Sequence, residues 1–255
     1  TRVKKIVAAA TLGTVEHVVA FNDVPYGEGY YAGWYRDYAE AGGLFLQKAT
    51  HDFDYISHIL EQPPKWVCAM KSQRVFGRCA DKPFELYCKD CGEKGTCTES
   101  PFNPKGMLTP SGRKAWKNWR KCLYSAAIRN EDSGNAILDY ANGVQASYTQ
   151  NFFAPRGAAR RGARLYGYRG TLEFDWYTNK ITIYPHARGA VKTINMAGDE
   201  AHFGGDDVLC KEFIAAMRER KASQAPLAAG ILSALTCLCA RESADRRIFC
   251  EVKLP

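Results

Sequence analysis

The second half of the chain contains a succession of short segments in which polar and apolar residues alternate, and these segments constrain the fold most. Residues 136–141 and 144–153 alternate on either side of Asn142-Gly143, a dipeptide typical of two-residue hairpin turns. Further strands are predicted at 164–168, 171–175, 180–184 and 191–196. Strands that follow one another directly along a chain favour antiparallel pairing.

Helical patterns occupy other parts of the chain. They are predicted at 2–10, after the glycine pair at 42–43, at 206–220 and at 227–246, and further strands are predicted at 15–21, 66–71 and 248–253. Strands grouped in one region with helices gathered elsewhere predict an α+β fold. We expect a large, mainly antiparallel open sheet with helices on one face.

Composition excludes several classes of protein. The 255 residues are 46% hydrophobic and 24% charged, which is ordinary for a globular domain. The net charge of +8 is spread over local clusters at 113–120 and 156–164, so nucleic-acid binding is not expected. No run of about 18 apolar residues occurs, and no membrane span is predicted. Ten cysteines without an export signal favour the reducing cytoplasm.

Residues 72–133 form a long irregular insertion that contains a group of cysteines. Cys88 and Cys91 form a CxxC pair, Cys97 follows six residues later, and Cys79 or Cys122 could supply a fourth thiolate. Converging thiolates suit a soft metal, and zinc in a closed structural site could stabilise a segment that lacks a core. A disulfide or plain reduced thiols explain the same pattern.

Residues 42–54 read Gly-Gly-Leu-Phe-Leu-Gln-Lys-Ala-Thr-His-Asp-Phe-Asp and begin a helix. Its predicted buried side consists of Leu46, Ala49, Phe53, Ile56 and Leu60. Gln47 and His51 are spaced by four and share the opposite side. An imidazole beside Lys48 and Asp52 can move a proton near neutral pH. An amphipathic helix with a solvated polar face explains the same spacing.

Four segments in order give the chain a family resemblance. Residues 42–54 resemble the Gly-Gly-x-x-x-(Asp/Glu)-x-x-x-His-x-x-Asp signature of the Gfo/Idh/MocA oxidoreductases, in their C-terminal, substrate-side domain. Residues 12–15 resemble the junction that follows the nucleotide domain of that family. Residues 166–173 resemble its Gly-x-x-Gly-(Thr/Glu)-Leu-Glu hairpin, and 204–206 with Phe213 resemble the start of its late helix.

The resemblance implies a domain organisation. Residues 1–13 would be the trailing helix of a missing dinucleotide-binding domain, and residues 14–255 the substrate-binding and oligomerisation α+β domain with its cysteine-rich insertion. No Gly-x-Gly-x-x-Gly turn follows a predicted strand, and the family's Glu-Lys-Pro motif is absent. The chain, which begins at Thr1, therefore resembles the second half of an enzyme that would need NAD or NADP bound by the missing Rossmann domain.

The resemblance also implies roles for individual residues. The activity would be hydride transfer between a nicotinamide and a carbinol carbon of a sugar, cyclitol or similar polyol. His51 would be the acid/base, Lys48 could assist as a donor to the hydroxyl, and Gln47 stands where family members often have a carboxylate. An amide cannot raise the imidazole pKa by charge, so Gln47 is a departure from the pattern.

The aromatic loop at 25–43 would approach the substrate in the resembled family. Trp34, Tyr35 and Arg36 are the predicted substrate contacts, although the loop aromatics could equally pack the loop against the domain. The resemblance favours Cys122 as the fourth metal ligand, and it implies a homo-oligomer formed through the bare face of the sheet.

Two other functions are compatible with the sequence. One is a non-enzymatic, metal-stapled binding module that holds a partner on a basic face. The other is a family relative that keeps the fold but has lost catalysis. Gln47, which replaces the carboxylate that family members often have, is the reason to consider it. Because a fold alone does not fix a function, the position of His51 decides among them.

Overall fold

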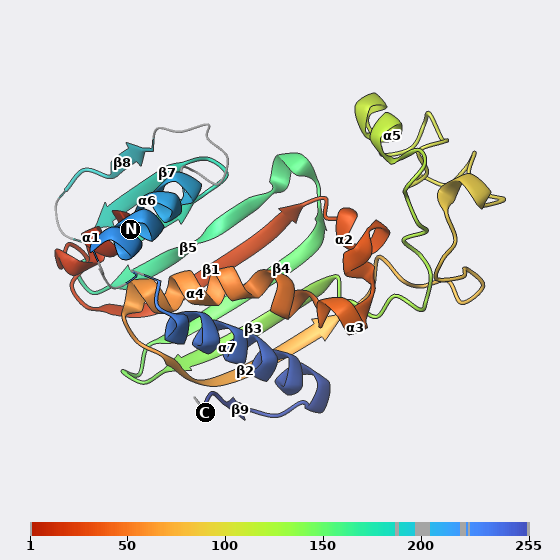
Figure 1. Cartoon of the computed structure of the whole chain (residues 1–255). Coiled ribbons are helices and arrows are strands. Elements are labelled where there is room, and N and C mark those ends of the chain that lie inside the picture. The colour runs from red at the N-terminus through yellow and green to blue at the C-terminus, as the bar shows by residue number, and fades with distance from the viewer. Residues whose placement is uncertain (1, 187–188, 197–204, 220–222, 224, 254–255) are drawn as a thin grey trace.

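The computed structural model describes residues 2–186, 189–196, 205–219, 223 and 225–253. Nine strands of this part form one sheet in the order β8-β7-β6-β5-β1-β4-β3-β2-β9 (Figure 1). The strands are β1 (Val15–Pro25), β2 (Pro64–Ser72), β3 (Ser133–Tyr140), β4 (Gln145–Ala154), β5 (Arg160–Gly167), β6 (Gly170–Asp175), β7 (Lys180–Pro185), β8 (Lys192–Asn195) and β9 (Cys250–Glu251). Neighbouring strands are antiparallel except β1 and β4, which run parallel. The predicted α+β fold is confirmed.

The hairpins follow the local sequence signals. Gly143 adopts φ +85° in the turn between β3 and β4, a backbone conformation that is costly for residues with a Cβ atom. β5, β6 and β7 pair as consecutive antiparallel strands, as the alternation predicts. The predicted closing strand is shorter than expected, because only Cys250–Glu251 pairs with β2.

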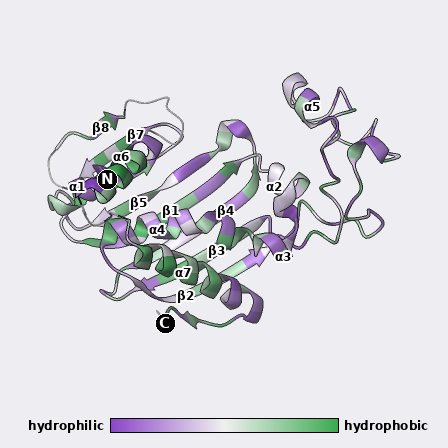
Figure 2. Ribbon diagram, viewed as in Figure 1, coloured by the Kyte–Doolittle hydropathy of each residue, from purple (hydrophilic) through white to green (hydrophobic). Residues whose placement is uncertain are grey.

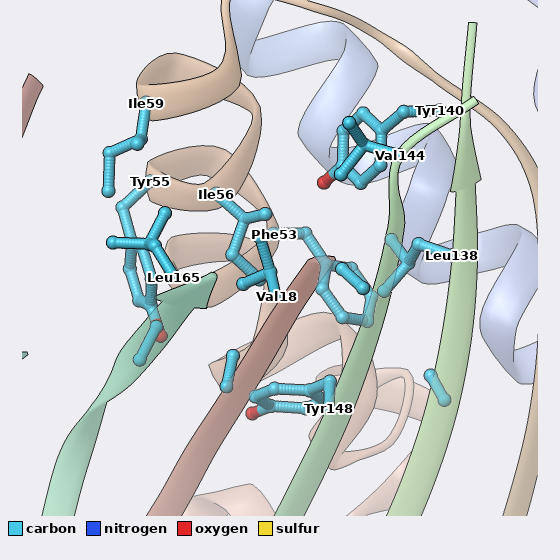
Figure 3. Close-up of a cluster of buried hydrophobic side chains, with 14 of the residues drawn as sticks. Val18, Phe53, Tyr55, Ile56, Ile59, Leu138, Tyr140, Val144, Tyr148 and Leu165 are labelled. Atoms are coloured by element: carbon cyan, nitrogen blue, oxygen red, sulfur yellow. The ribbon is translucent and has the colours of Figure 1, made fainter. Parts of the chain in front are cut away.

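The helices are α1 (Arg2–Ala8), α2 (Gly29–Ala32), α3 (Tyr38–Ala41), α4 (Thr50–Leu60), α5 (Pro110–Trp116), α6 (Gly205–Glu219) and α7 (Leu227–Arg246). α4 and α7 lie across one face of the sheet (Figure 1). The main core lies between α4 and the sheet, where Phe53 and Ile56 meet strand residues such as Val18 (Figure 3). Alternation along β3 turns Ile137 to the other face, where it is exposed.

α7 is long and apolar enough to cross a membrane by length and composition alone, and Figure 2 shows its hydrophobic colouring. In the fold it packs against β2 and α4. The Ser243 hydroxyl accepts a hydrogen bond from the Ala69 amide at 2.8 Å, and the Ser233 hydroxyl donates to the Thr50 carbonyl at 2.5 Å. These contacts are those of a core helix that covers a sheet.

The aromatic segment before α4 is more regular than the predicted loop. It contains α2, a 3₁₀ turn at Trp34–Arg36 and α3, whose N-terminus is capped by the Asp37 side chain. Gly42 ends α3 at φ +70°, and a π-helical turn at Phe45–Ala49 then leads into α4. The sequence signals failed here because these helices are too short to show periodicity.

The insertion between β2 and β3 projects from the sheet and carries α5 (Figure 1). Apart from α5 and a 3₁₀ turn at Cys88–Asp90 it is irregular, as predicted. A second hydrophobic cluster underlies its base, and consists of Val24, Tyr31, Ala32, Leu44, Phe76, Leu123, Ile128 and Phe152. Within the insertion, Arg120 and Glu99 form a buried ion pair at 2.7 Å. The insertion therefore has a core, contrary to the sequence-based expectation.

Candidate functional site

His51 lies in the first turn of α4, on the side that faces away from the core. Phe53 and Ile56 are buried as the spacing predicts, whereas the His51 side chain is exposed. It lines a cavity of about 820 Å³, within the range of about 300–1,000 Å³ typical of ligand sites. The opposite wall comes from the N-terminal part of α7, including Leu227. The imidazole is therefore accessible to a small molecule.

The residue after His51 anchors a buried polar network. Asp52 is fully buried and accepts hydrogen bonds from Asn22 Nδ2 at 2.7 Å, the Tyr148 hydroxyl at 2.8 Å and Arg161 Nε at 2.8 Å. Burial raises the pKa of Asp52, while Arg161 and the other two donors oppose that rise. Because β1, β4 and β5 each supply one donor, the network fixes the start of α4 on the sheet.

Lys48 lies one turn before His51, in the π-helical turn. Its Nζ atom sits over the Tyr30 ring, 4.7 Å from the centroid. The Tyr30 ring in turn contacts Tyr35 edge-on, with 5.1 Å between centroids. A half-buried ammonium on an aromatic face is held by the ring quadrupole, so Lys48 has a defined position beside His51.

The pKa values of both groups are lowered. Partial burial is the largest cause that lowers the pKa of His51. The charges of Arg161 and Lys48 lower this pKa further, and the charge of Asp52 opposes the shift. Partial burial likewise lowers the pKa of Lys48, and Arg161 adds to the effect. A neutral imidazole at neutral pH can accept a proton, which is the property that a general base needs.

Gln47 does not contact His51 through any hydrogen bond among the described residues. Its Nε2 atom donates instead to the Ala41 carbonyl at 2.9 Å, which ties the π-helical turn to α3. The role of Gln47 in catalysis stays a prediction.

The three predicted substrate contacts lie in different environments. Trp34 is 61% exposed and stacks on Tyr35 with 3.9 Å between ring centroids, and Tyr35 in turn adjoins Tyr30. Arg36 is buried, and its Nη2 donates to the Cys122 carbonyl at 2.9 Å. Trp34 and Tyr35 thus extend the aromatic surface toward Lys48, whereas Arg36 faces the insertion. Their contact with substrate stays a prediction.

The expected zinc site is not supported. Cys88, Cys91, Cys97 and Cys122 line one small cavity of about 20 Å³, and Cys79 lines another. Among the described residues, however, no group of three or more His, Cys, Asp or Glu side chains could hold a metal ion. The physical premise also fails, because the insertion is stabilised by its own apolar cluster and the Glu99–Arg120 pair. All ten cysteines are free, so the disulfide alternative is also wrong.

Cys210 is exposed on α6. Gly204, part of the fourth family segment, lies outside the described residues.

Sequence reasoning missed the central position of Arg161. The sequence shows only a cluster of basic residues at 156–164, yet Arg161 reaches the buried Asp52 and its guanidinium lies 4.8 Å from the Trp176 ring centroid. No local pattern pairs residues 109 positions apart. The one sequence signal that could have pointed to this ion pair was the carboxylate of Asp52, directly after His51.

Comparisons with known proteins agree on the kind of domain. The sequence model of the GFO/IDH/MocA C-terminal domain matches residues 1–173. YteT of Bacillus subtilis (strain 168), which is assigned by name to the oxidoreductases, is 25% identical over 241 residues. That alignment covers 83% of this chain and 56% of YteT. The chain thus spans little more than half the length of this curated relative.

Solved structures show the same fold. An oxidoreductase domain protein from Kribbella flavida superposes with a TM-score of 0.72 at 17% identity, over 99% of this chain and 63% of that one. Levoglucosan dehydrogenase, solved as a complex with NADH and levoglucosan, gives a TM-score of 0.72 at 14% identity, over 98% of this chain and 62% of that one. At these identities the likeness establishes the fold alone.

Proposed function

Since the chain belongs to the GFO/IDH/MocA family, we propose that it forms the substrate side of a nicotinamide-dependent oxidoreductase. The substrate would be a sugar, cyclitol or similar polyol with a secondary hydroxyl group. The observation that carries the proposal is an accessible His51 on the wall of a ligand-sized cavity. Lys48 does not line this cavity, but its charge acts on His51 and its ammonium is held over the Tyr30 ring.

The side chains have distinct tasks in this mechanism. A nicotinamide held by the partner domain would serve as the hydride acceptor for the carbinol carbon. His51 would then take up the hydroxyl proton, so that a carbonyl product could form. Lys48 donates a hydrogen bond to the same oxygen and stabilises the negative charge that develops on it. Arg161 and Asp52 do not touch the reacting atoms; they position the first turn of α4.

The nucleotide site would come from a dinucleotide-binding domain that is not among these residues. NADH is bound in the levoglucosan dehydrogenase complex, and this chain covers only 62% of that protein. We propose that NAD or NADP is held by such a domain, and that this chain alone binds neither tightly. The exposed sheet face around Ile137 would serve self-association, and the ten free cysteines suit the reducing cytoplasm.

A family relative without catalysis is the second candidate. The hydrogen bond from Gln47 to Ala41 supports it, because that amide is engaged in holding the helical turn and no carboxylate assists His51 there. The binding-module alternative loses its metal support, because the described residues contain no metal-binding group.

An activity assay separates the two candidates. This chain would be joined to a family dinucleotide-binding domain and assayed for NAD(P)-dependent oxidation of a panel of polyols. We expect His51→Asn to lower kcat by about 10²–10⁴-fold, as expected for loss of a general base, with the thermal unfolding midpoint unchanged. If the unmutated fusion is active and His51→Asn leaves its kcat unchanged, the role assigned to His51 is refuted. If the unmutated fusion binds NADH but oxidises none of the polyols, the relative without catalysis is favoured.

A further inference from the structure

Two free thiols meet where the last strand returns beside α7. Cys239 lies in the second half of α7, and Cys250 is the first residue of β9, the edge strand of the sheet (Figure 1). The Cys239 Sγ atom donates to the Glu251 carbonyl at 3.6 Å, and the Cys250 Sγ atom donates to the Glu242 carboxylate at 3.8 Å. Each thiol therefore reaches the immediate surroundings of the other cysteine.

The register of the sheet turns the Cys250 side chain toward α7. Cys250 lies opposite Val67 of β2, and side chains opposite each other on two paired strands lie on the same face of a sheet. Val67 is fully buried in the main core, and α7 packs against β2 on that face. Cys239 and Cys250 both contact this core while each keeps part of its surface exposed. Cys68, the next residue of β2, points to the opposite face.

The two thiols also contact each other. Burial raises the pKa of Cys239 to about 12, and a hydrogen bond with the Cys250 thiol contributes to this rise. Side chains whose sulfur atoms lie within hydrogen-bond reach can be joined by a disulfide with little movement of the backbone. Because a protonated thiol is a poor nucleophile, Cys239 reacts second and Cys250 is the sulfur that reacts first.

We propose that Cys239 and Cys250 are a modification site, at which a reversible disulfide fastens β9 to α7 when the surrounding thiol pool becomes oxidised. The oxidant is a low-molecular-weight disulfide such as oxidised glutathione. The Cys250 thiolate, which has lost its proton to water, attacks one sulfur of oxidised glutathione, so that a mixed disulfide forms and one glutathione thiolate leaves. Cys239 then loses its proton, attacks the Cys250 sulfur and releases the second glutathione. Two protein thiols are oxidised to one disulfide, and one oxidised glutathione is reduced to two glutathione thiols.

The disulfide would act on a weakly held edge of the sheet. β9 is two residues long and, among the described strands, pairs with β2 alone. Phe249, directly before β9, is 70% exposed and lines a cavity of about 430 Å³ together with Trp66 and Ile137. The link therefore holds the turn that carries Phe249 at the open face of the sheet, the surface that we propose for self-association.

Mass spectrometry of the full chain tests the proposal. The protein is incubated in mildly alkaline glutathione buffers of increasing oxidised fraction, alkylated and digested. We expect two peptides joined through Cys239 and Cys250, which separate after treatment with dithiothreitol, while Cys68 stays outside this link. Oxidation should also raise the thermal unfolding midpoint by about 5–10 °C, because the link closes a loop of about a dozen residues in the unfolded chain.

Serine variants give matched controls. Cys239→Ser should lose the rise in the unfolding midpoint and accumulate a mixed disulfide of Cys250 with glutathione. Cys210→Ser, which removes an exposed cysteine on α6, should keep both the linked peptides and the rise.

Three results would overturn the proposal. The first is recovery of Cys239 and Cys250 as separate alkylated peptides under conditions that attach glutathione to the exposed Cys210. The second is a link from either residue to a different cysteine. The third is a linked chain that unfolds at the same temperature as the reduced chain. If Cys239→Ser fails to fold, the peptide map of the unmutated chain still decides.

Discussion

Asp52→Ala tests whether the buried network beneath His51 holds α4 on the sheet. The change leaves the Arg161 guanidinium without its carboxylate and removes the acceptor of Asn22 and Tyr148. Removing one partner of a buried ion pair costs about 3–5 kcal/mol. For a domain of this size, each kcal/mol lowers the unfolding midpoint by about 2–4 °C, so we expect a fall of about 6–20 °C.

A neighbouring ion pair gives the matched control. Asp23 pairs with Arg160 Nε at 2.8 Å, one residue before Arg161, but the Arg160 side chain is 53% exposed. The exposed pair contributes little, but Asp23 also accepts a hydrogen bond from Asn151 Nδ2, so Asp23→Ala should cost about 1–2 kcal/mol, still less than Asp52→Ala. Both variants are measured by urea unfolding followed by circular dichroism, with the m-value checked for constancy. Similar losses in the two variants would refute the argument that burial decides the cost.

The double variant sharpens the result. Arg161→Met in the Asp52→Ala background removes the second charge, so no buried ion is left without a partner. We expect the double variant to be less destabilised than the sum of the single variants, with a coupling energy of about 1–3 kcal/mol. Strict additivity would mean that the 2.8 Å contact contributes nothing specific to the native state.

Three further measurements follow from the structure. The imidazole of His51 should titrate by NMR below its usual pKa of about 6.5; because the unfolded chain then binds the proton more readily, this group makes the fold less stable as pH falls through that value. A titration at or above about 6.5 would contradict the assigned burial and charges. Alkylation followed by mass spectrometry should modify exposed Cys210 first and Cys88 last, because burial raises the pKa of the Cys88 thiol to about 12; the reverse order would count against this assignment. Gly162→Ala should lower the free energy of unfolding by about 1–3 kcal/mol or more, measured by chemical denaturation. The added methyl group would lie 1.9 Å from the Phe174 carbonyl oxygen. An unchanged free energy of unfolding would show that β5 and β6 are spaced more widely.

The strands and their hairpins could be predicted because their signals are local. Alternation along 144–153 and the Asn142-Gly143 turn predict β4 and its pairing with β3. The buried face of α4, with Phe53 and Ile56, follows from helical spacing in the same way. The exposed position of His51 is a consequence of that spacing, so the main catalytic candidate could be found without a structure.

The insertion could not be predicted in the same way. Its cysteines suggested a metal, because no periodic apolar pattern announced a core. The core exists, but Leu123 and Ile128 of the insertion pack against Tyr31 and Leu44 from far earlier in the chain. A cluster assembled from distant segments leaves no repeating signal in any one of them.

The sequence by itself determined where strands, turns and the long helices lie, and which side of α4 carries His51, since each depends on residues within a few positions of one another. Only the tertiary structure decided that β1 runs parallel to β4 and that Arg161 meets Asp52. The register of β5 against β1 brings that arginine to the start of α4, and register is fixed by the packing of the whole sheet. The buried ion pair beneath His51 therefore arises from a contact between elements that no single segment specifies.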